Sequence, residues 1–163
     1  MNQEVFYATS SALCFTLLGF WWVVVQFRHA DLTRTRAARA FSLLVSLQFM
    51  LPGFVSLASL AAGEGSPLWR MVFATAGIAG LLSGLVALRV RSRERALGVA
   101  GGLAWLMAPV YVVLTLIALA PEAVRSAGFV PIQVEAFVLT ALLLIGVLIA
   151  WFLFVEPVAG EAA

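Results

Sequence analysis

The chain contains no lysine, because all ten of its Lys and Arg residues are arginine. Without a lysine amine there is no Schiff base to a retinal, so a retinal protein of the usual kind is excluded. The single histidine, His29, and the single cysteine, Cys14, are too few for a bis-histidine haem or a typical zinc site within one chain. A lone cysteine also cannot form an intramolecular disulfide.

Motifs for catalysis are lacking as well. The sequence holds no H-E-x-x-H zinc motif, no G-x-S-x-G nucleophile motif and no G-x-x-x-x-G-K-[ST] phosphate loop. His29 and Asp31 are two residues apart, but they fall on a solvated, arginine-rich loop rather than in a pocket. We therefore predict no catalytic residue, no metal site and no cofactor, and we do not expect an enzyme.

Charge is scarce throughout, at 11% of the 163 residues, while 63% are hydrophobic and the mean hydropathy is +1.06. Five long uncharged runs remain, and a helix needs roughly 20 residues to cross the hydrocarbon core of a bilayer. The sequence predicts an all-α, polytopic integral membrane protein: a five-transmembrane-helix bundle that forms one membrane domain over residues 1–163, with no soluble domain. The expected helices are 5–27, 40–62, 69–89, 96–120 and 132–155.

The arginines are distributed unevenly among the expected loops. Only Arg70 and Arg125 fall on one side of the membrane. Short cytoplasmic loops collect positive charge, so we expect the N-terminus outside and the C-terminus in the cytoplasm. Arginine without lysine, together with a richness in Ala, Gly, Val and Leu, indicates a GC-rich bacterial genome, so we expect the plasma (inner) membrane of a bacterium. The eight arginines expected on the cytoplasmic side are Arg28, Arg34, Arg36, Arg39, Arg89, Arg91, Arg93 and Arg95.

The densest basic cluster is "RVRSRERA" at 89–96. We interpret it as a topology signal that also contacts the headgroups of membrane lipids. No aromatic residues interleave its arginines, so we do not expect nucleic acid as a partner.

Two stretches of the sequence resemble each other at an offset of 57 residues. "MLPGFVSLASLA" at 50–61 and "MAPVYVVLTLIA" at 107–118 share Met, Pro, an aromatic residue, Val, Leu and Ala. Gly19 also aligns with Gly80 when the preceding spans are matched through their following arginines. The pattern predicts a duplicated helical hairpin followed by an added fifth helix. Chance matching of apolar sequences is the alternative.

Gln48 is the most notable deep polar residue, and it precedes Pro52 by one helical turn. Pro52 and Pro109 each remove a backbone donor from a membrane helix, which frees a carbonyl and kinks the helix. The freed carbonyl of the first kink is that of Gln48 itself. One interpretation is a hinge or a polar solute pathway, and the other is a static kink whose polar groups bond to a neighbouring helix.

The third expected span carries "GIAGLLSG", in which Gly80 and Gly84 form a G-x-x-x-G pair next to Gly77. Small residues at this spacing let another helix approach closely. We predict that these three glycines pack against a helix of the same subunit or of an identical one.

Two glutamates are expected toward the outer surface. Glu135 follows Pro131 by about one turn of the last helix, where a carboxylate is costly and is a functional candidate by default. The alternative places Glu135 in the headgroups, bonded to Arg125 or Gln133. Glu4 begins the first helix and is a second candidate on a solute pathway. Trp69 is expected as an aromatic anchor at the interface.

These features leave two functional hypotheses. The first is a small homo-oligomeric channel or transporter for an ion or small solute, with a pathway between subunits or along Gln48, Pro52, Pro109, Glu135 and Glu4. The second is a non-transporting accessory or structural subunit that binds another membrane protein. Water at Gln48 or Glu135 would favour transport, whereas dry side chains there would favour the accessory subunit.

Overall fold

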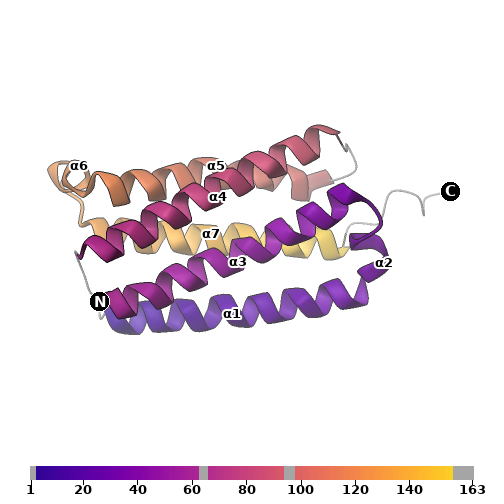
Figure 1. Cartoon of the computed structure of the whole chain (residues 1–163), viewed down its shortest axis with the longest axis horizontal. Helices are drawn as coiled ribbons and strands as arrows, with labels where there is room; N and C mark the ends of the chain where they lie inside the picture. The colour runs from indigo at the N-terminus through magenta and orange to yellow at the C-terminus, as the bar shows by residue number, and fades with distance from the viewer. Residues whose placement is uncertain (1–2, 63–65, 94–97, 156–163) are drawn as a thin grey trace.

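The computed structural model describes residues 3–62, 66–93 and 98–155, and over these ranges the secondary structure consists of helices joined by short turns, with no strand (Figure 1). Two short helices are α2 (His29–Leu32) and α6 (Pro121–Ser126). The five long helices are α1 (Gln3–Phe27), α3 (Arg36–Ala62), α4 (Pro67–Arg93), α5 (Gly98–Leu119) and α7 (Pro131–Val155).

The long helices lie side by side with alternating direction (Figure 1). α3, α4, α5 and α7 form a closed ring in which each helix packs on the next, and α1 packs on the outside of this ring against α3. The beginning of α1 and the helix α6 lie at one end of the bundle, and α2 and the end of α7 lie at the other. We call these the α6 end and the α2 end.

The helices extend beyond the uncharged runs from which they were predicted. α3 begins at Arg36 rather than at 40, and α4 continues to Arg93 rather than ending at 89. Arginine is a good helix former, so a helix does not stop where its apolar stretch stops. α7 begins at Pro131, since a proline lacks only an N–H that the first turn of a helix leaves unbonded anyway.

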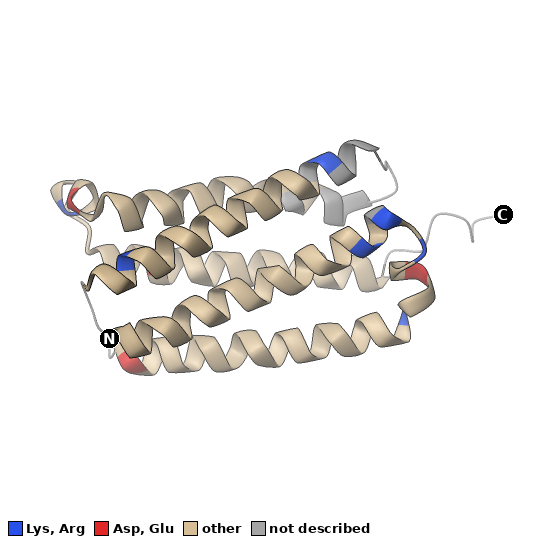
Figure 2. Cartoon of the chain, viewed as in Figure 1, with Lys and Arg blue, Asp and Glu red and all other residues tan. Residues whose placement is uncertain are grey.

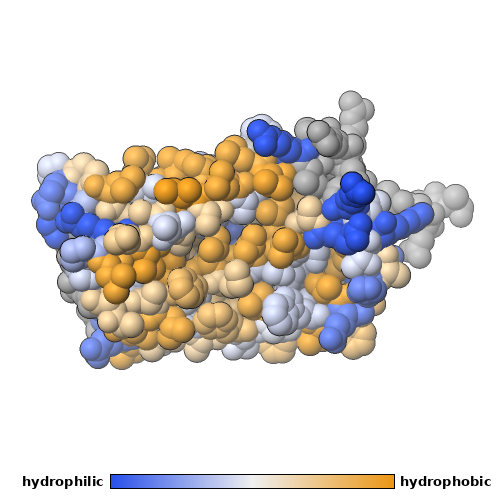
Figure 3. All heavy atoms as spheres, in the orientation of Figure 1, coloured by the Kyte–Doolittle hydropathy of each residue, from blue (hydrophilic) through white to orange (hydrophobic). Residues whose placement is uncertain are grey.

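The helices fit a membrane-embedded protein by length and composition. Leucine, valine and aromatic side chains point outward along the long helices. Figure 3 shows, on the visible face, a hydrophobic middle between hydrophilic ends. Within the described residues, four segments are long and apolar enough to cross a bilayer: Gln3–Phe27, Ala38–Ala62, Pro67–Ala87 and Pro131–Val155. The apolar part of α5, Trp105–Leu119, is shorter.

Hydrogen bonds tie α1 to the ring near the α2 end. Trp21 is buried and donates its indole N–H to the carbonyl of Ser42 on α3 over 3.2 Å. Arg28 follows α1 and donates from Nη1 to the carbonyls of Leu153 and Phe154, at 2.7 and 2.9 Å. These carbonyls belong to the last turn of α7, where no intrahelical donor is available, so Arg28 caps that helix.

The two hairpins of the proposed repeat are both present as packed helix pairs, α1 with α3 and α4 with α5. The matched residues nevertheless have opposite environments. Tyr111 is 1% exposed, whereas its match Phe54 is 58% exposed. Pro52 is buried and its match Pro109 is exposed. The sequence match therefore does not extend to equivalent packing, because the matched helix faces point in different directions.

Candidate functional site

The centre of the four-helix ring is held by a hydrogen-bonded glutamine. The Gln48 side chain, 1% exposed, extends from α3 and donates from Nε2 to the carbonyl of Leu142 on α7 over 3.2 Å. Its Oε1 accepts a hydrogen bond from the Tyr111 hydroxyl on α5, also over 3.2 Å. Three helices of the ring thus meet at one amide. Burying this amide without partners would cost several kcal/mol, and both of its ends are bonded.

Glycines make room for this central network. A Cβ on Gly80 of α4 would fall on the Tyr111 ring, and a Cβ on Gly146 of α7 would lie 3.0 Å from Cγ of Gln48. The predicted packing glycines on either side of Gly80 also face α5. Gly77 lies against Thr115, and a Cβ added to Gly84 would lie 3.4 Å from Ala108. The structure thus places all three at a contact within the subunit, where the missing side chains let α4 and α5 approach closely.

The two prolines lie in different environments, Pro52 buried one turn beyond Gln48 and Pro109 exposed. Pro52 is buried within α3, and the adjacent Gly53 lies against α1, where an added Cβ would be 2.8 Å from Cβ of Cys14. Pro109 lies within α5 but is exposed on the outer surface of the bundle. Because Pro109 faces outward, the helices do not form a pathway inside one subunit along both prolines.

Glu135 is fully buried, with 0% of its surface exposed. The alternative that places it among headgroups, bonded to Arg125 or Gln133, stays a prediction; Arg125 itself pairs with Glu122 over 2.6 Å. The level of Glu135 follows from the contact between Gln48 and Leu142. Because α3 and α7 run in opposite directions, seven residues from that contact toward the α6 end bring Glu135 level with Val55 and Ser56, at a rise of about 1.5 Å per residue.

Other buried polar residues cluster in the same part of the bundle. The contact of Gly53 with Cys14 sets the register of α1 against α3, so the first half of α1 lies beside the last turns of α3. Glu135 therefore lies at the same level of the bundle as several buried hydroxyl-bearing residues. The buried residues of this polar layer, besides Glu135, are Tyr7, Ser10, Ser11, Ser56 and Ser59.

The remaining candidate residues lie at the two ends of the bundle. Glu4 is exposed on the first turn of α1 and does not enter the polar layer. At the α2 end, Arg89 is exposed on α4, and Arg91 and Arg93 belong to the last turn of that helix. Arg95 lies outside the described residues. Neither Glu4 nor Arg89 is brought near Gln48.

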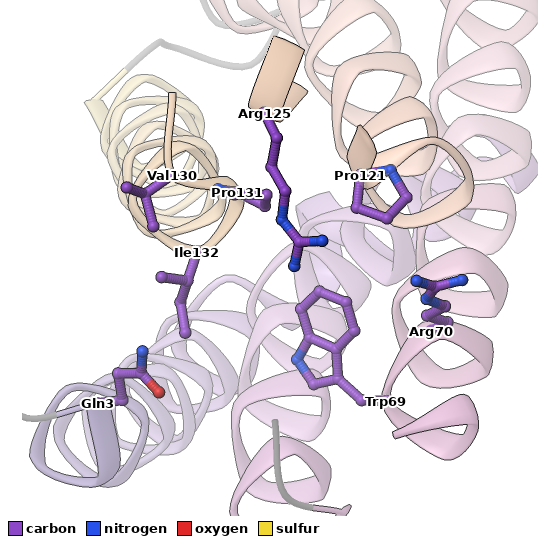
Figure 4. A pocket seen from close by; sticks show the side chains of 8 residues that line it. All are labelled: Gln3, Trp69, Arg70, Pro121, Arg125, Val130, Pro131 and Ile132. Atoms are coloured by element: carbon purple, nitrogen blue, oxygen red, sulfur yellow. The ribbon is translucent and has the colours of Figure 1, made fainter. Parts of the chain in front are cut away.

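A pocket of about 290 Å³ opens at the α6 end of the bundle (Figure 4). Trp69 forms part of its wall. The sequence predicted an aromatic anchor at the interface. Trp69 lies at the α6 end, is 6% exposed and packs its ring against Phe73 at a centroid distance of 4.9 Å. The lining residues are Gln3, Trp69, Arg70, Pro121, Arg125, Val130, Pro131 and Ile132.

Two apolar pockets lie along the seam between α1 and α7, which touch only slightly. The one near the α6 end, of about 480 Å³, is lined by Phe6, Gln133, Ala136, Phe137 and Thr140, and we call it the groove. The other, near the α2 end and of about 240 Å³, is lined by apolar and aromatic residues of α1, α3 and α7, among them Trp21, Phe49 and Trp151.

Within the described residues, no three His, Cys, Asp or Glu side chains gather as they would around a metal ion. No family model, curated protein or solved structure matches the chain.

Proposed function

We propose that this chain is a multi-pass protein of a bacterial inner membrane that crosses the bilayer five times, with its N-terminus outside and its C-terminus in the cytoplasm. α5 supports the fifth crossing, since its 22 residues at about 1.5 Å each extend roughly 33 Å. The arginine distribution supports the orientation (Figure 2). At the α2 end lie Arg28, Arg34, Arg36, Arg39 and Arg89, and at the α6 end lie Arg70 and Arg125.

We further propose that the protein acts as a non-transporting accessory subunit of a membrane complex. The observation that carries this proposal is the bonded amide of Gln48. Its donor and its acceptor ends are both occupied by groups of the same chain, and Tyr111, Phe49 and Leu142 fill the space around it. A solute passing through the ring would have to break these hydrogen bonds and displace closely packed side chains. Such a centre suits a static scaffold better than a conducting interior.

A second candidate is the homo-oligomeric channel or transporter, and Glu135 is the observation that favours it. A carboxylate buried in a membrane helix is costly, and carboxylates at such positions commonly mark ion or proton pathways. In this candidate the pathway runs between subunits and reaches the polar layer around Glu135.

Flux through proteoliposomes distinguishes the two candidates. For the accessory subunit we expect no flux of cations, anions or protons above that of empty liposomes. Flux in the wild type that falls in Glu135→Gln or Gln48→Leu, but not in the exposed control Glu122→Gln, would contradict the accessory proposal and establish transport. Each variant is compared at equal oligomeric state and thermal stability.

The single cysteine reports water access whatever the solute. Cys14 is 0% exposed and lies against Gly53, so a membrane-impermeant maleimide should leave it unlabelled in liposomes and label it after SDS denaturation. A Ser126→Cys variant in the Cys14→Ala background places a thiol on exposed α6 and is the positive control. Labelling of native Cys14 at a rate close to that of this control would show a water-filled interior and overturn the accessory proposal.

A further inference from the structure

We propose that the pocket at the α6 end binds the phosphate-bearing headgroup of an anionic membrane lipid, with an acyl chain of the same lipid lying in the groove between α1 and α7. This site is independent of whether the protein transports a solute.

The charges that line the pocket favour an anion. Arg70 and Arg125 contribute two guanidinium groups, and no carboxylate is among the eight lining residues. Glu122 accepts one hydrogen bond from Nη1 of Arg125, whereas Arg70 has no ion-pair partner among the described residues. α7 begins at the wall of the pocket, so the positive end of its dipole adds to this potential. Guanidinium groups bind phosphate oxygens through charge-assisted hydrogen bonds.

Trp69 supplies a donor that the described protein does not use. The indole Nε1 is buried and has no hydrogen-bond partner within the described part of the chain. In Figure 4 the nitrogen-bearing edge of the ring faces the side of the pocket formed by Gln3 and Ile132, while the guanidinium group of Arg125 lies on the opposite side of the ring. Leaving a buried indole N–H without an acceptor is costly, and a small shift on binding would give it one.

The groove begins one helical turn from the pocket, on the side toward the middle of the bundle. Gln3 borders the pocket, and Phe6, one turn further along α1, borders the groove. On α7, Ile132 borders the pocket and Ala136, again one turn further, borders the groove. A molecule that places its anionic group between the arginines can therefore extend an apolar chain along the seam. This combination fits a phospholipid better than a soluble anion.

Native mass spectrometry of the detergent-purified protein, titrated with a short-chain lipid, tests the proposal. We expect dioctanoyl phosphatidylglycerol to bind at least tenfold more tightly than either dioctanoyl phosphatidylcholine or glycerol phosphate. Arg70→Gln should weaken phosphatidylglycerol binding about tenfold, as expected for the loss of one charge-assisted contact. The matched control is Arg36→Gln, which removes an exposed arginine at the α2 end.

Four results would overturn the inference, each in its own way. Equal binding of glycerol phosphate would identify a site for a soluble anion, and equal binding of phosphatidylcholine would remove the requirement for net negative charge. An equal loss in Arg36→Gln and Arg70→Gln would show general electrostatic attraction instead of a pocket. A Thr140→Trp variant, which fills the groove, should also weaken phosphatidylglycerol binding, and unchanged binding would remove the acyl chain from the groove.

Discussion

Gly80 illustrates how single residues position the polar centre of the bundle. Its missing side chain leaves the space that the Tyr111 ring occupies, and the Tyr111 hydroxyl in turn bonds to Gln48. Gly146 accommodates the stem of Gln48 from the opposite side of the ring. The hydrogen bonds of the glutamine therefore depend on two glycines that make no polar contact themselves.

Replacing Gly80 with alanine should destabilise the protein, whereas the same change at Gly19 should not. The added Cβ at position 80 would overlap the Tyr111 ring, and overpacking of this kind costs about 1–3 kcal/mol. Gly19 has no atom within 4 Å of an added Cβ, and in a helix interior alanine is favoured over glycine by roughly 1 kcal/mol. Thermal unfolding in detergent measures both variants. Equal unfolding midpoints for Gly80→Ala and Gly19→Ala would show that Tyr111 does not require the space at Gly80.

Among the elements, α7 combines the features most relevant to function. It begins at the pocket of the α6 end and places Glu135 in the polar layer. Its Leu142 carbonyl accepts a hydrogen bond from Gln48, and its last turn is bonded by the guanidinium group of Arg28. α1 and α7 barely touch along the groove, so the Arg28 hydrogen bonds are one of the few links between them. The last turn of α7 is thus held by a residue that follows α1 in the sequence.

Arg28→Gln should loosen the end of α7 without unfolding the bundle. The substitution removes the donors to Leu153 and Phe154 and the ion pair of Arg28 with Asp31, a loss of about 1–2 kcal/mol for a partly buried cap. We expect hydrogen exchange of the last turn of α7 to accelerate about tenfold, while exchange at Gln48 and its neighbours stays unchanged. Arg34→Gln, an exposed change near α2, is the control. Equal exchange in both variants would contradict the capping role of Arg28.

At the scale of the whole molecule, charge lies at the two ends and an apolar surface lies between them (Figures 2 and 3). The end with α2 carries the larger share of the described arginines. Positively charged loops are retained in the cytoplasm during insertion, which gives the molecule one preferred orientation. In the proposed orientation, the pocket with Arg70 and Arg125 lies on the outer side.

Fusions of a reporter that is active only in the cytoplasm test this orientation. We expect the reporter to be inactive when fused after Gly65, between α3 and α4, and active when fused after Arg93, at the end of α4. The opposite pattern would invert the topology and place the pocket at the α6 end on the cytoplasmic side. Activity at both positions would contradict a crossing by α4.

The sequence alone predicted a membrane-embedded protein and the approximate extent of its long helices. Hydrophobic runs and scarce charge predict membrane helices because a bilayer excludes unpaired polar groups, and the Pro131 start of α7 follows from the tolerance of a first turn for proline. The helix faces were decided only in the tertiary structure. In lipid, outward and inward surfaces are both apolar, so no hydropathy pattern shows that Glu135 and Trp69 are buried while Pro109 faces outward. The packing of Gly80 against Tyr111 and of Gly146 against Gln48 helps to fix which helix faces point inward.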